Sequence, residues 1–222
     1  YPLQYLLGQW EFFGLPFWVG EGVLIPRQDT EVLVEEALAR LEGRARPRVA
    51  DLCCGSGCVG LAIAYHRQDA RVALYDASEE ALAYARRNRE LLGLASAEVT
   101  RWDICQPVQR QFDMIVSNPP YIPAGELCSL PVEVLYEPRQ ALDGGEDGLQ
   151  FYRILARAWQ NCLAEEGWLL VECGCGQAGQ VGGIFRQAGL VNVQTVRDLA
   201  GIERVVAAQK SGQEEPCRWE TD

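Results

Sequence analysis

The residues best suited to chemistry form the run Ser117-Asn118-Pro119-Pro120-Tyr121, which directly follows the apolar segment 112–116. That segment predicts a buried strand, and the two prolines end it because neither donates a ladder hydrogen bond. The Asn118 carboxamide and the Tyr121 ring are therefore expected on a stiff turn at the carboxyl end of a strand, where open α/β sheets bind ligands. A carboxamide oxygen accepts N–H groups, and an aromatic ring offers a flat face. The run suits a planar N–H donor, such as an amide or an exocyclic base amine; a polar turn is the simpler alternative.

A second candidate site is the glycine-rich turn Asp51-Leu52-Cys53-Cys54-Gly55-Ser56-Gly57. It closes a predicted strand over 49–53 and opens a predicted helix over 59–65. Glycines let the backbone approach a ligand closely, and a helix N-terminus favours negative charge. The spacing Gly55-x-Gly57-x-x-Gly60 also matches the dinucleotide fingerprint. By itself this turn indicates a nucleoside cofactor and leaves NAD and S-adenosylmethionine open.

Two acidic residues, Asp51 and Asp103, favour S-adenosylmethionine over NAD, and a third, Asp76, fits the ribose of either cofactor. Asp51 stands just ahead of the glycine turn, where a carboxylate pairs with an ammonium but repels a pyrophosphate. Asp76 ends the strand predicted over 71–75, where an acid accepts hydrogen bonds from ribose hydroxyls. Asp103 follows the strand predicted over 97–101 and is placed to accept from an adenine amine. Solvated acids beside an ordinary strand–helix turn are the structural alternative.

Composition narrows the class of protein. The 222 residues suffice for one large α/β domain, and the apolar and charged fractions of 48% and 23% are ordinary for a globular protein. No membrane span or signal peptide is recognisable, so we expect a cytoplasmic protein. A net charge of −11 without a basic stripe argues against direct nucleic-acid binding and allows steering of a basic protein partner. Nine cysteines without paired C-x-x-C spacing, and with His66 as the single histidine, predict reduced thiols and no metal site.

Alternating strand and helix patterns predict a doubly wound, mostly parallel sheet. Further strands are expected at 112–116, 168–172, 192–196 and 204–208, the last two antiparallel, and helices at 30–41, 59–65, 78–92, 149–163 and 179–188. Residues 1–26 suggest a hairpin or small cap and no helix, and the loop 119–148 is long enough to be functional. The predicted organisation is a hairpin and helix over 1–46, a catalytic domain over 47–209 and a disordered polar tail over 210–222.

Taken in order, the segments from Pro2 to about Ala208 resemble the HemK-type class I methyltransferases that modify glutamine in peptide-chain release factors. The matching segments are Pro2–Gly8, Phe13–Leu15, Val23–Glu31, Asp51–Gly57, Val116–Ile122, Glu137-Pro138, Gly144–Leu149 and Asp198–Gly201. The resemblance implies a Rossmann-like fold with a mostly parallel seven-stranded sheet and an antiparallel last strand. It also implies S-adenosylmethionine as methyl donor and a release-factor glutamine as acceptor. We expect a monomer.

The resemblance also assigns site residues by position. Asn118, Pro119 and Tyr121 would be catalytic: the Asn118 side-chain oxygen and the Pro119 carbonyl accept the two amide N–H groups, and Tyr121 packs on the carboxamide. Pro120, Pro26, Arg27 and Glu31 would complete the substrate pocket, although Arg27 equally suits a structural salt bridge. The cofactor would contact Asp51, Cys53, Cys54, Gly55, Ser56, Gly57, Asp76, Trp102, Asp103, Ile104 and Asn118.

The chain departs from the family pattern in several places. The family usually carries a helical domain ahead of the position of Tyr1, Cys53-Cys54 stands where Gly-Thr or Cys-Thr is common, and Gln28-Asp29 replaces Pro-Glu. A sister family that methylates glutamine on a ribosomal protein shares the Asn-Pro-Pro-Tyr run but usually lacks the pair seen here as Thr30-Glu31. An N6-adenine or N4-cytosine methyltransferase acting on a flipped-out base stays open, as does a nicotinamide-dependent oxidoreductase or nucleotide-binding module.

Overall fold

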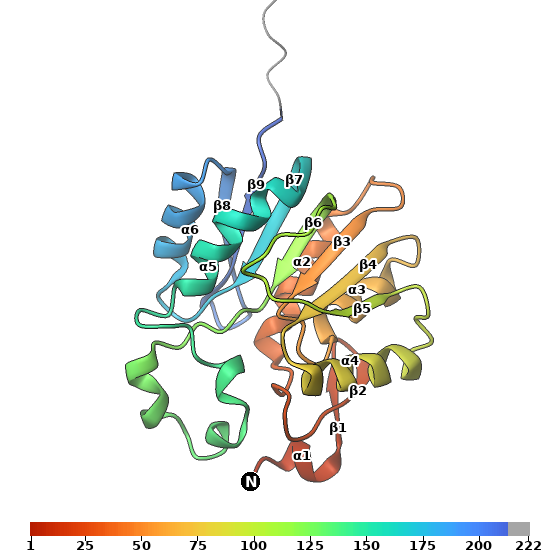
Figure 1. Ribbon diagram of the computed structural model, residues 1–222, viewed down its shortest axis with the longest axis vertical. Coiled ribbons are helices and arrows are strands. Elements are labelled where there is room, and N and C mark those ends of the chain that lie inside the picture. Colours follow the sequence, from red (N-terminus) through yellow and green to blue (C-terminus); the bar gives the residue numbers. More distant parts are fainter. Residues whose placement is uncertain (213–222) are drawn as a thin grey trace, which may run out of the picture.

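The computed structural model describes residues 1–212, which form a seven-stranded sheet with helices on both faces (Figure 1). The spatial order of the strands is β5-β4-β3-β6-β7-β9-β8. All pairs from β5 to β7 are parallel, whereas β9 runs antiparallel to both β7 and β8. The expected fold class is confirmed. The strands are β3 (Arg48–Leu52), β4 (Arg71–Asp76), β5 (Glu98–Arg101), β6 (Phe112–Ser117), β7 (Leu163–Glu172), β8 (Val191–Arg197) and β9 (Glu203–Gln209).

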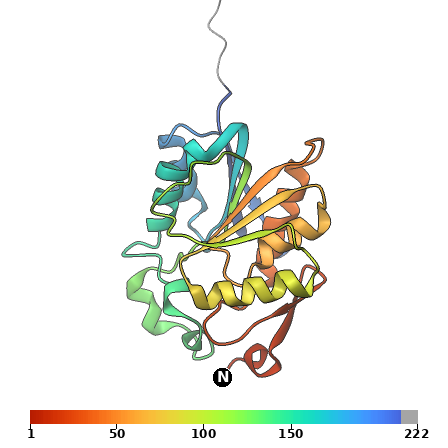
Figure 2. The same ribbon diagram turned by 45° about the vertical axis from the view of Figure 1, so that its right-hand side comes forward.

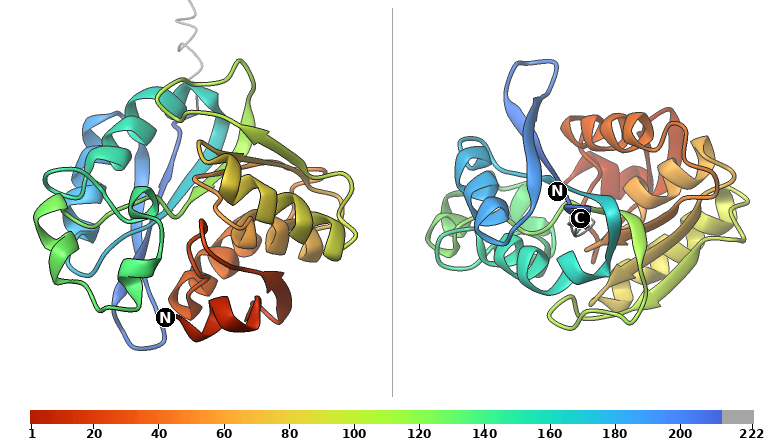
Figure 3. Two further views of the ribbon diagram at one scale, coloured as in Figure 1. Left: turned by 60° about the horizontal axis from the view of Figure 1, so that its bottom comes forward. Right: turned by 90° about the horizontal axis from the view of Figure 1, so that it is seen from above.

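Helices lie on both faces of the sheet (Figure 3), and a layer of apolar side chains fills the space between the sheet and the helices on each face. Alternate residues of a strand point to opposite faces, so in β3 Val49 packs in one layer while Ala50 and Leu52 pack in the other. Helices α2 (Glu31–Arg40), α3 (Cys58–His66) and α4 (Glu79–Leu91) cover the first face. Helices α5 (Gln150–Ile154) and α6 (Ala178–Gln187) cover the second. Burial on both faces explains why the central strands are almost continuously apolar.

The N-terminal segment contains a helix that the sequence pattern did not predict. Helix α1 (Leu3–Leu7) precedes the hairpin of β1 (Gln9–Phe12) and β2 (Leu15–Trp18). Pro2 stands at the start of α1, and Gly8 ends it in the left-handed conformation at φ 72°. The expectation of a hairpin without a helix was therefore wrong for these five residues, which are too few to show a helical period.

The N-terminal hairpin lies beside α4 (Figure 2), and the buried Asn88 of that helix attaches it to the sheet domain. The Asn88 side-chain oxygen accepts a hydrogen bond from the Trp18 N–H at 2.6 Å. Its side-chain nitrogen donates to the carbonyl of Trp18 at 3.1 Å and to the carbonyl of Ser56 at 2.9 Å. Nearby, a Cβ on Gly20 would collide with the Tyr84 hydroxyl, so a larger residue there would displace the Tyr84 side chain. One side chain thus joins the hairpin to the glycine-rich turn.

Other element boundaries differ from the prediction where local geometry changes. The helix expected at 149–163 keeps α-helical geometry only to Ile154 and continues as a π-helix (Leu155–Trp159) and a 3₁₀ turn (Gln160–Cys162). Strand β7 begins at Leu163, five residues earlier than expected. The loop 119–148 contains the 3₁₀ turns η2 (Ala124–Ser129), η3 (Val134–Tyr136) and η4 (Arg139–Ala141), and another, η1 (Gln28–Thr30), precedes α2.

Two further expectations concern the chain as a whole. Of the predicted polar tail, residues 213–222 lie outside the described part of the chain. Within the described part, every helix is too short or too polar to cross a bilayer.

Candidate active site

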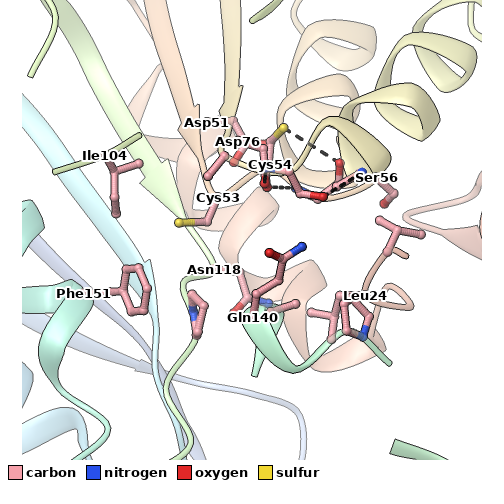
Figure 4. A pocket seen from close by; sticks show the side chains of 18 of the residues that line it. Leu24, Asp51, Cys53, Cys54, Ser56, Asp76, Ile104, Asn118, Gln140 and Phe151 are labelled. Atoms are coloured by element: carbon pink, nitrogen blue, oxygen red, sulfur yellow. Dashed lines mark hydrogen bonds between the residues drawn. The ribbon is translucent and has the colours of Figure 1, made fainter. Parts of the chain in front are cut away.

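A cavity of about 320 Å³ opens at the carboxyl ends of β3, β4 and β6 (Figure 4). The chain leaves β3 toward β4 on one side, and β6 lies on the other, so the cavity sits where the strand order reverses. Its walls include the segment after the hairpin (22–27), the glycine-rich turn, the turns after β4 (76–78), β5 (102–105) and β6 (Asn118 and Pro120), the 3₁₀ turn η4, and residues of α5. A cavity of this size accommodates a small ligand such as a nucleoside.

The glycine-rich turn approaches the cavity through backbone that only small residues permit. Gly57 has φ 80°, and a Cβ there would lie 3.0 Å from the side chains of Leu61 and Leu74. At Gly60 a Cβ would lie 2.8 Å from the Asp51 Oδ2 atom. The Gly60 N–H instead donates to that oxygen at 2.8 Å. Gly57 itself is absent from the cavity wall and shapes it through the backbone, whereas Gly55 and Ser56 line it.

Two carboxyl groups lie beneath the turn, that of buried Asp51 and that of partly buried Asp76. Burial raises the pKa of Asp51 to about 7, although the Gly60 N–H favours the ionised form. Burial also raises the pKa of Asp76, whose two oxygens accept from the N–H groups of Gly55 and Ser78, each at 2.9 Å. Asp76 therefore shapes the turn as well as lining the cavity.

The cavity matches the chemistry of the cofactor expected from the sequence. Asp51 lines the cavity and supplies a carboxyl group suited to an ammonium group. Trp102, Asp103 and Ile104 all line the far wall beside Phe151, where apolar and acidic groups suit an adenine ring and its amine. Apolar surface with a few convergent polar groups is typical of cofactor sites.

The cysteines of the cavity wall are thiols held neutral by burial. Cys53, Cys54 and Cys58 line the cavity, and burial raises the pKa of each thiol, that of Cys58 to about 12. Cys53 has the left-handed φ of 56°, which is unusual for a residue with a Cβ. These cysteines therefore act as small packing residues around the turn.

Some residues of the predicted Asn-Pro-Pro-Tyr turn line the cavity, and others pack in the core. Asn118 and Pro120 line the cavity, and the Asn118 nitrogen donates to the Thr30 hydroxyl at 3.2 Å. Pro119 is buried, and neither it nor Tyr121 belongs to the cavity wall. Tyr121 packs against the core beneath α5 and α6, and its carbonyl accepts from the Gln177 side chain at 2.9 Å. The structure thus brings Asn118 to the cavity and leaves Tyr121 behind the turn.

Of the substrate-binding residues expected near the N-terminus, two line the cavity and one does not. Pro26 and Arg27 line the cavity, and Arg27 forms an ion pair with the buried carboxyl of Glu137. Glu137 also accepts from the Ile25 N–H at 2.9 Å, so it fastens the segment after the hairpin to the loop before η4. Arg27 thus forms a structural ion pair, and a role in substrate binding stays a prediction. Glu31 lies outside the cavity wall and accepts from the Phe13 N–H at 2.8 Å, which corrects the expectation that it faces the pocket.

Sequence reasoning missed two polar residues beside Asn118. Thr30 is 2% exposed and lines the cavity, and Glu172 is 2% exposed at the end of β7. Burial raises the pKa of Glu172 to about 7. The available signal was an acid ending an apolar strand, the same pattern that singled out Asp76.

Comparisons with known proteins agree on the class of enzyme. A family model described as the methyltransferase small domain matches residues 28–145, more than half of the chain. A solved methyltransferase from Pyrococcus furiosus superposes with a TM-score of 0.65 over 90% of each chain, and at 17% identity it supports the fold alone.

Closer relatives carry one name. The release factor glutamine methyltransferase of Geobacter sulfurreducens is 48% identical over 94% of this chain and 73% of its own length. That of Moorella thermoacetica is 44% identical over 95% of this chain and 75% of its own length. The solved release factor-specific protein-(glutamine-N5) methyltransferase of Alicyclobacillus acidocaldarius is 33% identical, with a TM-score of 0.53 over 88% of this chain and 99% of that one.

These relatives confirm the resemblance seen in the sequence, and membership of a methyltransferase family gives S-adenosylmethionine as the cofactor. With a glycine-rich cofactor cavity and Asn118 at its mouth, the chain belongs to the family of release factor glutamine methyltransferases.

Proposed function

We propose that this protein methylates the side-chain nitrogen of a glutamine in a peptide-chain release factor, with S-adenosylmethionine as methyl donor. The observation that carries the proposal is the Asn118 carboxamide at the mouth of the cofactor cavity, with its nitrogen engaged by Thr30. Because that nitrogen is occupied, the side-chain oxygen is the atom left to receive N–H groups from a substrate. A glutamine carboxamide presents two such groups on one nitrogen.

The difficulty of the reaction lies in the nucleophile. An amide nitrogen is weakly nucleophilic because its lone pair is delocalised into the carbonyl, whereas the bound cofactor supplies an electrophilic methyl group on a sulfonium. Positioning can supply much of the acceleration. In the proposal, the Asn118 side-chain oxygen and the Pro119 backbone carbonyl accept the two N–H groups and hold the nitrogen. These acceptors also stabilise the positive charge that develops on it, and a proton then leaves to water.

The walls of the cavity support this role. The ion pair of Arg27 with Glu137 holds the outer wall against the loop before η4, so the site is enclosed by segments from distant parts of the chain. The mostly apolar lining favours the release of water when substrate binds, which strengthens the hydrogen bonds to the substrate amide. The role of Tyr121 in this proposal is indirect: it supports the turn from behind.

The proposal is tested by incubating the protein with S-adenosylmethionine and an intact release factor, followed by mass spectrometry of the glutamine-containing peptide. We expect one added methyl group on glutamine. At saturating cofactor, Asn118→Ala should lower kcat/KM for the release factor about 100-fold, because it removes one preorganised partner of the reacting group. Asn192→Ala is a matched control, since Asn192 is exposed on β8 and pairs with Gln209.

Two results would refute the proposal. One is methylation of a DNA base or a ribosomal protein in parallel incubations while the release factor stays unmodified. The other is an Asn118→Ala variant that methylates the release factor at the rate of the unsubstituted protein.

A further inference from the structure

Glu172 lies beside Asn118, and one oxygen of its buried carboxyl group forms no hydrogen bond with the described residues. Strand β7 pairs in parallel with β6, with Val171 opposite Ser117, so Glu172 and Asn118 leave adjacent strand ends. The Glu172 side chain is buried, and its Oε2 atom has no hydrogen-bond partner among the described residues. A buried, unsatisfied carboxyl oxygen is costly, so its retention calls for an explanation.

The charged groups around Glu172 are occupied elsewhere. On β9, the Arg204 guanidinium pairs with Asp198 at 2.9 Å and with Asp29 at 2.8 Å. From α5, the Tyr152 hydroxyl donates to the Glu172 backbone carbonyl at 2.9 Å and leaves the carboxyl unengaged. Of these charged groups, Arg204 favours the ionised carboxyl and Asp29 disfavours it.

Besides Tyr152, three further ionisable side chains interact with the charge on Glu172. They are the Tyr121 hydroxyl and the thiols of Cys58 and Cys173, and burial raises the pKa of each. All three are therefore neutral at ordinary pH, so the groups that respond directly to the charge on Glu172 are the Thr30 hydroxyl and the Asn118 carboxamide.

A hydroxyl between a carboxylate and a carboxamide can fix the direction of the carboxamide. The Thr30 oxygen accepts from the Asn118 nitrogen at 3.2 Å, so its own hydrogen must go to another acceptor. The ionised carboxyl of Glu172 is such an acceptor. While it is ionised, the Asn118 nitrogen is drawn toward Thr30 and Glu172, and the oxygen is left for the cavity. A protonated Glu172 becomes a donor, which competes for the Asn118 oxygen and lets the carboxamide turn.

We propose that ionised Glu172, acting through Thr30, is a positioning residue that holds the Asn118 oxygen toward the substrate amide, and that its protonation releases this orientation. The inference rests on the proposed glutamine methylation. Burial raises the pKa of Glu172 to about 7, and the Thr30 and Asn118 side chains oppose that rise. Glutamine binding should therefore be favoured above pH 7 and weakened below it.

The orientation can be observed without catalysis. In ¹⁵N-labelled protein, the side-chain amide signals of Asn118, assigned by their loss in Asn118→Ala, should titrate with a midpoint near pH 7. Glu172→Gln should abolish this titration. Glu203→Gln is the matched control and should leave it unchanged, because the Glu203 carboxylate on β9 is paired with Arg197 at 2.8 Å.

Kinetics then separate positioning from folding. At saturating cofactor, kcat/KM for the release factor should fall about tenfold per pH unit below the midpoint, as for one essential ionised group. The kcat/KM of Glu172→Gln should not depend on pH, and its value should equal the low value that the unsubstituted enzyme reaches at acid pH. Thr30→Val should lower kcat/KM at every pH, and Thr30→Ser should restore both the rate and the pH profile. The cofactor affinity of Glu172→Gln, measured by calorimetry at each pH, should match that of the unsubstituted protein.

The inference is overturned if the Asn118 signals do not titrate, or if Glu172→Gln keeps the same midpoint. If Glu172→Gln does not bind cofactor and is therefore misfolded, the Thr30→Val and Thr30→Ser variants test the inference instead. The inference is overturned if the Asn118 signals of Thr30→Val titrate with the same midpoint as those of the unsubstituted protein. If the Asn118 signals titrate as expected but no glutamine is methylated at any pH, the proposed function fails and the coupling of Glu172 to Asn118 stands.

Discussion

Replacing Asp51 with asparagine should make the cofactor-free protein more stable at pH 8 and leave its stability unchanged near pH 4. Asp51 is 1% exposed, and burial raises its pKa from 3.8 to about 7. Each pKa unit corresponds to about 1.4 kcal/mol, so this rise corresponds to about 4 kcal/mol. Below pH 3.8 both the folded and the unfolded states hold the proton, and burial carries no ionisation cost.

The sign follows from proton binding. Between pH 3.8 and about 7 the unfolded chain has lost the Asp51 proton and the folded chain has kept it, so stability falls as the pH rises. Above pH 7 both states are ionised, and the loss is complete. Asparagine has nearly the same shape and still accepts from the Gly60 N–H, but it cannot ionise. The gain from Asp51→Asn should therefore grow from near zero at pH 4 to about 4 kcal/mol at pH 8.

The assay is urea unfolding of both proteins at half-unit pH intervals without cofactor, because a bound ligand would stabilise the folded state by itself. The difference between the two curves removes the contributions of other titrating groups, including Glu172. A difference that changes by less than about 1 kcal/mol from pH 4 to pH 8 would refute the reasoning. So would an Asp51→Asn variant that is less stable than the unsubstituted protein at pH 8. The variant should also bind S-adenosylmethionine more weakly at pH 8, where it lacks the carboxylate.

Three further substitutions test how the site is supported. Glu137→Ala leaves a buried backbone N–H unpaired and should cost about 1–3 kcal/mol in urea unfolding, with weaker cofactor binding; unchanged values would contradict its fastening role. Asn88→Leu removes three hydrogen bonds, two of them to Trp18, and should cost about 2–4 kcal/mol, whereas a loss below about 1 kcal/mol would show that the hairpin is held by packing. Gly57→Ala should lower cofactor affinity and stability more than the control Gly93→Ala. Both glycines have positive φ, but only a Cβ at Gly57 would meet close neighbours. Equal effects of the two substitutions would argue against crowding as the cause.

The element pattern was readable from the sequence where a periodic signal was long enough. The alternation of buried strands with helices such as α4, which begins at the Ser78 cap, predicted the sheet and its two helix layers. Short or irregular elements escaped. Helix α1 spans five residues, and the π-helix at Leu155–Trp159 differs from an α-helix in hydrogen bonding, which side-chain spacing does not reveal.

What the sequence determined by itself was the chemistry at the strand ends. Asp51 and Asp76 lie at the carboxyl ends of apolar strands, and Asn118 directly follows one. The carboxyl ends of parallel strands meet at one edge of the sheet, so the convergence of these residues could be predicted. The tertiary structure decided the partners. Glu137 and Arg27 meet from positions 110 residues apart, Glu31 turns to the hairpin instead of the cavity, and Thr30 and Glu172 meet Asn118. Local pattern shows where a strand ends, but which side chain faces another across the fold depends on packing between distant segments.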